Sequence, residues 1–207
     1  DNDESLVSLS LALITLSPIL LMASYAALAV QSREYIIIVM WAGQLASEGF
    51  NWLLKHVMKE ARPGGIGNGY GFPSSHSQYM AYFGSFLMCH MYFRHRFATT
   101  GVLFFDQLWR THRYYLGYHS TSQVLWGVGI GILLGISLYV VAELIPRKRP
   151  FSILGKTKRA LLSHPLSQWF RIRDGWAVWT DGGREGEWTR WRNEWERRQI
   201  THEKRLQ

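Results

Sequence analysis

The sequence has almost no cysteine and little charge for its length. Cys89 is the single cysteine among 207 residues, which excludes a small scaffold held together by disulfide bonds. Charged residues make up only 18% of the chain, whereas 47% of the residues are hydrophobic and 14% aromatic, so a disordered chain is also excluded. The eight histidines form no dense ligand set with carboxylates at His-x-x-x-His or similar spacing. A metal hydrolase is therefore disfavoured, and no metal site or cofactor is predicted.

The front part of the chain has no excess charge of either sign. Residues 1–146 contain 8 basic and 8 acidic residues, whereas residues 147–207 contain 15 Lys+Arg and 7 Asp+Glu, so the net charge of +8 lies in the tail. The mean hydropathy of −0.09 is the average of an apolar front part and a polar tail. The pattern predicts a transmembrane domain over residues 1–146 and a basic cytosolic tail over residues 147–207. Anionic lipid is sufficient to explain such a tail, so nucleic acid binding is disfavoured.

Long runs without charge predict membrane-spanning helices. A span of roughly 30 Å of hydrocarbon needs about 20 apolar residues. The first run could instead be a cleaved signal peptide, but its acidic flank and its length argue against that. Gly101–Tyr118 has only a short apolar stretch and is a poor span. We therefore predict an all-α polytopic bundle of four to five spans, with four clear spans at Leu6–Val30, Ile36–Leu54, Gln78–Phe93 and Val124–Ala142.

Two of these runs carry a distinctive face. Gln44, Ser47, Glu48 and Asn51 follow helical spacing in the second run and are expected to face other helices rather than lipid. In the last run, a stripe of small residues at four-residue spacing predicts close helix contact. The stripe consists of Gly127, Gly131 and Gly135.

Basic residues next to the spans predict the sidedness of the chain. The positive-inside rule places Arg94–Arg96 and Arg147–Arg149 in the cytosol. Counting crossings backward then places Lys55–Ser77 and His119 together on the opposite, lumenal or external, side. This count requires one crossing between Arg96 and His119, where the sequence offers its poorest span.

The tail contains three tryptophans at spacings of three and four, with arginines between them. Trp188, Trp191 and Trp195 predict an amphipathic helix that either lies on the membrane surface or packs its aromatic face on the rest of the protein.

Three short blocks carry groups that can bind and cleave phosphate. Lys55 and Arg62 are seven residues apart, which predicts that both project from one face of a helix that ends before Pro63. Taken alone, such residues are more often anchors at the end of a span. The second block, Gly71-Phe-Pro-Ser-Ser-His76, precedes a helix, where Ser74 and Ser75 could cap the helix or help its first turn bind an anion.

The third block contains Arg113, His119 and Gln123. If a helix starts near Ser120, the amide of Gln123 could reach an imidazole nitrogen of His119 and fix its tautomer. A lone histidine at a helix start usually has a structural role. Here the predicted topology places it on the same side of the membrane as a second histidine, His76, three cations and two serines.

In this order, Lys-x6-Arg-Pro, Pro-Ser-x-His and Arg-x5-His resemble the three signature blocks of the type 2 phosphatidic acid phosphatase superfamily. More narrowly, the blocks resemble the dolichyldiphosphatases of the endoplasmic reticulum. Leu108-Trp109-Arg110 and Ile172-Arg173-Asp174 also resemble that subgroup, so the likeness covers nearly the whole chain.

The resemblance implies a metal-independent mechanism. His119 would attack the terminal phosphorus to form a phosphohistidine, while His76 would protonate the leaving oxygen and later activate water. The phosphoryl oxygens would be bound by Lys55, Arg62, Arg113, Ser74 and backbone donors near Ser75. Preorganised cations and an imidazole pair with pKa values near neutrality suit this chemistry.

The match departs from the family pattern in three residues and in length. Ser75 stands in place of a Gly, Gln123 in place of an Asp, and His112 in place of a Ser. In the family a full transmembrane helix separates the cytosolic loop after the second block from the arginine of the third block. Here Leu108–Arg110 runs almost directly into Arg113, so about 15–20 apolar residues, one helix, are expected to be absent.

The predicted function is hydrolysis of dolichyl diphosphate in the endoplasmic reticulum membrane, with the active site facing the lumen and the dolichyl phosphate returned to protein N-glycosylation. The predicted partners are this substrate and membrane lipids. One alternative is a phosphatase for phosphatidic acid, a sphingoid phosphate or another polyprenyl diphosphate. Another is a catalytically impaired isoform that acts only as a membrane interaction protein.

Overall fold

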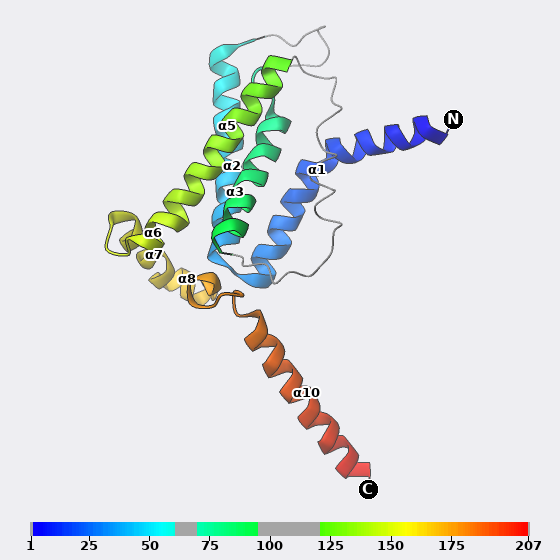
Figure 1. Cartoon of the computed structure of the whole chain (residues 1–207), viewed down its shortest axis with the longest axis vertical. Helices are drawn as coiled ribbons and strands as arrows, with labels where there is room; N and C mark the ends of the chain where they lie inside the picture. Colours follow the sequence, from blue (N-terminus) through cyan, green and yellow to red (C-terminus); the bar gives the residue numbers. More distant parts are fainter. Residues whose placement is uncertain (1, 61–69, 95–120, 207) are drawn as a thin grey trace.

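The computed structural model describes residues 2–60, 70–94 and 121–206, with side chains over 16–60, 70–94 and 122–200. This part consists of helices joined by turns and short irregular segments, with one isolated bridge between Glu34 and Arg173. The first three predicted apolar runs each fall within one long helix, and the fourth, Val124–Ala142, begins in one helix and continues into the π turn that follows it. These helices are α1 (Asn2–Ser32), α2 (Tyr35–Met58), α3 (Ser75–Phe93) and α5 (Thr121–Tyr139), and they form the bundle in Figure 1. The predicted all-α architecture is confirmed.

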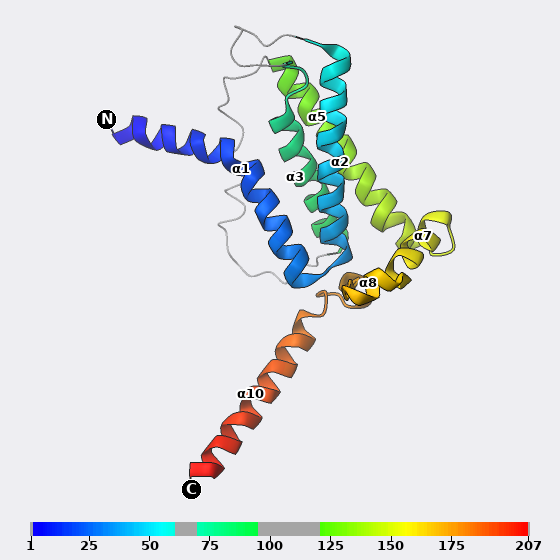
Figure 2. The same ribbon diagram turned by 180° about the vertical axis from the view of Figure 1, so that it is seen from behind.

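Beyond α5 the chain continues as a series of shorter helices. A single wide π turn, η2 (Val140–Leu144), joins α5 to α6 (Ile145–Lys148) without a break. The remaining helices are α7 (Ile153–Ser163), α8 (Pro165–Trp169), α9 (Gly175–Val178) and α10 (Arg184–Leu206). The first three of them lie at one end of the bundle, whereas α10 extends away from it (Figures 1 and 2).

Within the described ranges, one helix is long and apolar enough to cross a membrane. It covers the 27 residues Ser122–Lys148, and Leu16–Ser32 is a shorter apolar helix. The predicted total of four to five spans therefore stays a prediction, as does the division at residues 146 and 147. The poor span Gly101–Tyr118 lies outside the described residues.

The helix α1 changes direction part-way along, and only its second half runs beside the bundle (Figure 2). Pro18 lies inside this helix. A proline removes one backbone hydrogen bond and its ring collides with the preceding turn, so it accounts for a bend here. Tyr25, in the second half of α1, is 3% exposed and joins the core.

The closest helix pair is α3 and α5, which meet along the predicted stripe of small residues. A Cβ atom at Gly127 would lie 2.7 Å from the carbonyl oxygen of Ser74, and one at Gly131 would collide with the carbonyl oxygen of Gln78. Gly135 faces Ser85 in the same way. Side chains at these positions would force the two backbones apart, so the prediction of close helix contact is confirmed.

This contact predicts a position-specific effect of added methyl groups. Gly131→Ala is expected to destabilise the bundle by about 1–3 kcal/mol, because its Cβ would also meet the Cβ of Ala81 at 2.8 Å. Gly129→Ala is the matched control on the same helix, since a Cβ there meets nothing within 4 Å. Thermal unfolding of both variants in detergent micelles measures the difference, and an equal change in the two midpoints would contradict the proposed close contact.

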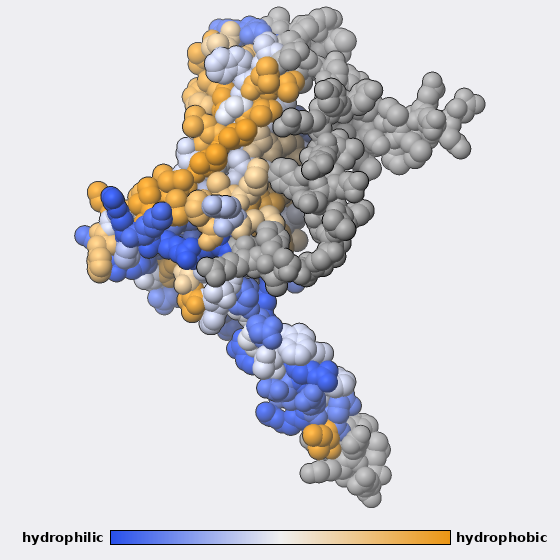
Figure 3. Space-filling model, viewed as in Figure 1, coloured by the Kyte–Doolittle hydropathy of each residue, from blue (hydrophilic) through white to orange (hydrophobic). Residues whose placement is uncertain are grey.

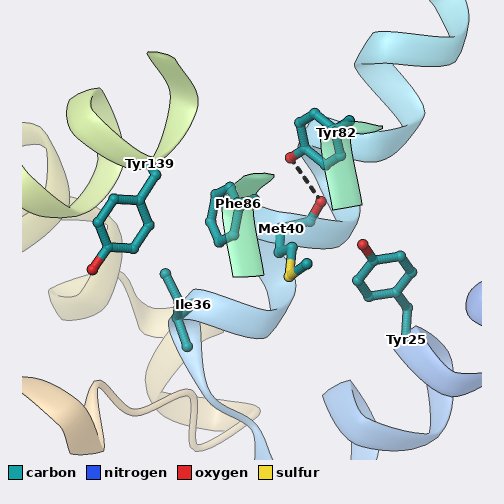
Figure 4. Packing of buried hydrophobic residues seen from close by; sticks show 6 residues of the cluster. All are labelled: Tyr25, Ile36, Met40, Tyr82, Phe86 and Tyr139. Carbon is teal, nitrogen blue, oxygen red and sulfur yellow. Dashed lines mark hydrogen bonds between the residues drawn. The ribbon is translucent and has the colours of Figure 1, made fainter. Parts of the chain in front are cut away.

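The core lies between α1, α2, α3 and α5 and is rich in aromatic side chains. The hydroxyl of Tyr82 donates to the carbonyl oxygen of Met40 at 3.0 Å, so the buried phenol keeps a hydrogen bond. Figure 4 shows how these side chains from different helices gather between the ribbons. The cluster consists of Tyr25, Ile36, Met40, Tyr82, Phe86 and Tyr139.

Buried ion pairs attach the segment after α6 to the end of the bundle. The π turn carries Glu143, whose carboxylate is 2.8 Å from the guanidinium of Arg94 and 2.6 Å from the ammonium of Lys158. Lys158 also lies 2.6 Å from Asp174. These four side chains are each at most 10% exposed. The helix α7 and the residues before α9 are therefore held against α3 and η2.

A second carboxylate, Glu34, ties the turn between α1 and α2 to the same segment. It accepts from the guanidinium of Arg173 at 2.8 Å and from the backbone N–H of Gly175 at 2.9 Å. Burial raises the pKa of the Glu34 carboxyl, while the Gly175 hydrogen bond and the Arg173 charge act in the opposite direction. Both ends of the turn thus depend on residues more than 130 positions away in the sequence.

The helix α10 carries the three tail tryptophans and leaves them in solvent. Trp188 and Trp191 are each 56% exposed and Trp195 is 43% exposed. Trp191 and Trp195 stack on each other with ring centroids 6.3 Å apart. The alternative in which this face packs on the rest of the protein is therefore not the arrangement observed.

Candidate active site

The candidate site lies at the end of the bundle where α2 ends and α3 and α5 begin, at the top of Figure 1. The described part of the chain brings five predicted site residues to this end: Lys55, Ser74, Ser75, His76 and Gln123. The other three, Arg62, Arg113 and His119, lie outside the described residues.

Lys55, one of the three predicted phosphate-binding cations, contacts Ser75 directly. The ammonium of Lys55, near the end of α2, donates to the hydroxyl of Ser75 at 2.5 Å, and this hydroxyl donates to the side-chain oxygen of Asn51 at 2.9 Å. Ser75 is the first residue of α3, so the ammonium lies beside the first-turn N–H groups of a helix start. Positive charge next to such a helix start favours a phosphate group.

Asn51 and Gln78 continue this network into the bundle. The amide of Asn51 donates to the side-chain oxygen of Gln78 at 2.7 Å, and the amide of Gln78 donates to the carbonyl and hydroxyl oxygens of Ser47 at 2.9 and 3.0 Å. Asn51 is 1% exposed and Gln78 is fully buried. Gln44 and Ser47 are buried as well, whereas Glu48 is half-buried, so the expected inward direction is confirmed for three of the four polar residues. Their link to Lys55 through Ser75 was not predicted.

Ser74 acts as the cap of α3. Its hydroxyl accepts from the backbone N–H of Ser77 at 3.5 Å and lies 3.0 Å from the Ser77 hydroxyl. The side chain is fully buried, and the backbone N–H of Ser74 donates to the carbonyl oxygen of Gln123 at 3.3 Å. The capping interpretation is confirmed, while phosphate binding by this hydroxyl stays a prediction.

His76 follows Ser75 in α3, and its half-buried side chain contacts α1. Its Nε2 atom is 3.3 Å from the hydroxyl of Ser17. Ser17 precedes Pro18, so the bent helix α1 brings a polar group to this imidazole. An imidazole with hydrogen-bond partners at a helix start can serve as a general acid and base.

The helix that carries Lys55 ends earlier than the sequence predicts. It stops at Met58, because Lys59 adopts a left-handed conformation with φ of 49° and its N–H returns to the carbonyl oxygen of Lys55 at 3.0 Å. Such a residue is a common helix terminator. The prediction that Lys55 and Arg62 share one face of a continuous helix is therefore wrong.

Glu60, a residue of the first block with no predicted role, connects the end of α2 to the segment before α3 and to α5. Its backbone oxygen accepts from Gly71 N–H at 2.8 Å, and its carboxylate accepts from the amide of Gln123 at 3.2 Å. The predicted helix start near Ser120 agrees with the observed start of α5 at Thr121. The predicted orienting contact of Gln123 with His119 involves a residue outside the described part and stays a prediction.

The family of the chain is shown by comparison with known proteins. The model of the PAP2 superfamily matches residues 34–147, which contain all three signature blocks. The chain belongs to the PAP2 superfamily. Dolichyldiphosphatase 1 of Rhinolophus ferrumequinum is 34% identical over 79% of this PAP2 chain and 74% of its own length. The human and Dictyostelium discoideum proteins of the same name are each 33% identical, with the same two coverages.

No solved structure matches this PAP2 chain. Its relatives are dolichyldiphosphatases, as the resemblance of the three blocks predicts. The family and these relatives support a hydrolase that acts on phosphate esters.

Proposed function

We propose that this chain is a lipid diphosphatase that converts dolichyl diphosphate to dolichyl phosphate and inorganic phosphate. The observation that carries the proposal is the hydrogen bond from the ammonium of Lys55 to the hydroxyl of Ser75 at the start of α3. His76 is the next residue of this helix. This arrangement joins a fixed positive charge, helix N–H groups and an imidazole at one end of the bundle. The names of the relatives supply the dolichyl substrate.

In the proposed mechanism the reaction takes two steps. His119 attacks the terminal phosphorus, the nitrogen–phosphorus bond forms as the bridging oxygen–phosphorus bond breaks, and His76 gives its proton to the departing dolichyl phosphate. His76 then takes a proton from water, which attacks the phosphohistidine and releases inorganic phosphate. No metal takes part. Lys55 and the arginines Arg62 and Arg113 stabilise the charge on the phosphoryl oxygens in both steps.

We place the site on the lumenal side of the endoplasmic reticulum membrane. The positive-inside rule supports this side, because Arg94 and Arg147 lie at the end of the bundle opposite Lys55. Dolichyl phosphate released there would return to protein N-glycosylation.

A direct assay tests this function. Purified chain is expected to release phosphate from dolichyl diphosphate, with activity unchanged by a chelator and reduced by about four orders of magnitude or more in His119→Ala, because the nucleophile is lost. Phosphatidic acid is the matched competing substrate. Equal turnover of phosphatidic acid would contradict the narrow substrate assignment, and chelator-sensitive activity would contradict the metal-independent mechanism.

A second candidate, a catalytically impaired form, is favoured by the length of the matched region. The match covers 79% of the chain, about 164 of 207 residues, whereas the three alignments extend over 189, 184 and 177 residues. The relatives thus have about 13 to 25 positions inside the match that this chain lacks. We infer that this difference lies between Arg110 and Arg113, where the sequence predicts that one helix of the family is absent.

Complementation separates the two candidates. Cells deficient in dolichyl diphosphatase would receive either this chain or a version with a 20-residue apolar helix, about one span, inserted between Arg110 and Thr111. Rescue by both supports the proposed enzyme. Rescue by the extended version alone supports the impaired form, whose His119 would then lie on the wrong side of the membrane from His76.

A further inference from the structure

The end of the bundle opposite the candidate active site has a groove of about 860 Å³. It lies between the end of α3, the helices α6 and α7, and the residues around α9. We call it the basal groove. In Figure 3 strongly hydrophilic residues gather at this end, next to the apolar surface of α5, as well as along α10. Its lining includes Arg94, Arg147, Lys158, Arg159, Trp176 and Thr180.

Of the four cations among the described lining residues of the basal groove, two are already neutralised. Arg94 and Lys158 share the buried carboxylate of Glu143, and Lys158 also pairs with Asp174. Two positive charges and two negative charges therefore cancel within the protein. Arg94 and Lys158 therefore stabilise the groove, and its net charge comes from the other two cations.

The other two cations have neutral protein partners. Arg147 donates to the carbonyl oxygen of Phe93 at 3.3 Å, and Arg159 donates to the carbonyl oxygen of Pro150 at 2.8 Å. Across residues 16–60, 70–94 and 122–200, neither guanidinium forms an ion pair with a carboxylate. Each guanidinium has five N–H donors, so one carbonyl contact leaves capacity for an anion. Among the residues that the structure describes, the basal groove thus has a surplus of two positive charges.

The location of the basal groove points to a lipid as the source of this anion. Arg147 belongs to the last turn of the helix Ser122–Lys148, which is long and apolar enough to cross a membrane. Phe151 and Ile153, next to the groove, are 78% and 83% exposed. Exposed apolar side chains, a tryptophan and arginines at the end of a span are typical of the headgroup region of a bilayer.

We propose that the basal groove binds the phosphate of an anionic phospholipid headgroup through Arg147 and Arg159. Guanidinium groups bind phosphate oxygens by charge-assisted, often bidentate, hydrogen bonds. The site lies at the other end of the bundle from Lys55 and Ser75, so it is separate from the proposed hydrolytic site. A phosphodiester lipid suits it, because binding there requires no cleavage.

Native mass spectrometry of the full chain, released from detergent with phosphatidylglycerol or phosphatidylcholine added, tests the proposal. The wild-type chain is expected to retain phosphatidylglycerol over phosphatidylcholine. The double variant Arg147→Gln/Arg159→Gln is expected to bind phosphatidylglycerol about tenfold more weakly, because both charge-assisted contacts are lost. The matched control Arg184→Gln/Arg190→Gln removes the same charge from α10 and is expected to change this affinity by less than about twofold.

Two further measurements separate loss of binding from loss of folding, and a lipid ligand from free phosphate. Thr180→Glu adds a carboxylate to the groove lining without removing an arginine, and we expect it to weaken phosphatidylglycerol binding even if the double variant folds poorly. Inorganic phosphate is added as a competitor. Unchanged binding in both groove variants, or equal loss in the α10 control, would overturn the proposed site. Full displacement by inorganic phosphate at millimolar concentration would overturn the lipid as its ligand.

Discussion

Lys55→Met is expected to lower kcat/KM for dolichyl diphosphate by about 100-fold or more, because it removes a preorganised positive charge from the proposed phosphate site. The ammonium of Lys55 is already fixed on Ser75 at 2.5 Å, so little reorganisation is needed when charge develops on the phosphoryl oxygens. Steady-state phosphate release by purified variants measures the loss. Methionine keeps most of the length of the side chain and therefore preserves its packing.

Lys59→Met is the matched control for this prediction. Lys59 lies four residues further along, is exposed, and ends α2 through its backbone conformation. The control removes the same charge near the same end of the bundle, and its kcat/KM is expected to stay within about twofold, as for an exposed charge screened by salt. Similar losses in the two variants would show that Lys55 acts only through the general electrostatic field.

Asn51 provides a second check on the role of Lys55. Because Asn51 accepts from Ser75, and Ser75 accepts from Lys55, we infer that Asn51 positions the ammonium without touching substrate. Asn51→Leu should therefore lower kcat/KM in the wild-type chain but add little in the Lys55→Met background, because coupled residues are not additive. Full additivity would contradict this positioning role.

The parts of the fold that follow from local periodicity could be predicted from the sequence. The spacing of Gln44, Ser47 and Asn51 indicated an inward polar face, and the spacing of Gly127, Gly131 and Gly135 indicated close packing. Both are observed, because a helix places residues three and four positions apart on one side whatever the rest of the chain does. The cap at Ser74 is likewise a local feature.

Features that depend on distant residues could not be predicted in this way. The early end of α2 rests on the left-handed conformation of Lys59, for which the sequence offers no glycine or asparagine as a signal. The basal ion pairs join Arg94, Glu143 and Lys158 across separate helices. In the sequence these residues look like ordinary charges near the end of a span or in a basic tail. Their pairing becomes visible only when the helices are placed together.

Glu143→Ala is expected to lower the free energy of unfolding by about 3–5 kcal/mol, the usual effect of removing one partner from a buried ion pair. The Glu143 side chain is 2% exposed and contacts two cations. After the substitution Lys158 keeps Asp174, whereas the guanidinium of Arg94 loses its carboxylate while remaining buried. Unfolding in detergent micelles, followed by circular dichroism, measures the change in stability.

Glu196→Ala is the control, because Glu196 forms an ion pair of the same 2.6 Å length with Arg192 on the exposed helix α10. That pair is expected to contribute only about 0.5 kcal/mol, since water and salt screen it. Limited trypsin digestion gives a second readout. If Glu143 attaches α7 to the bundle, Glu143→Ala should speed cleavage between residues 153 and 179, and Glu196→Ala should not. Equal stability and equal cleavage in the two variants would contradict this attachment, because removing the buried carboxylate would then cost no more than removing the exposed one.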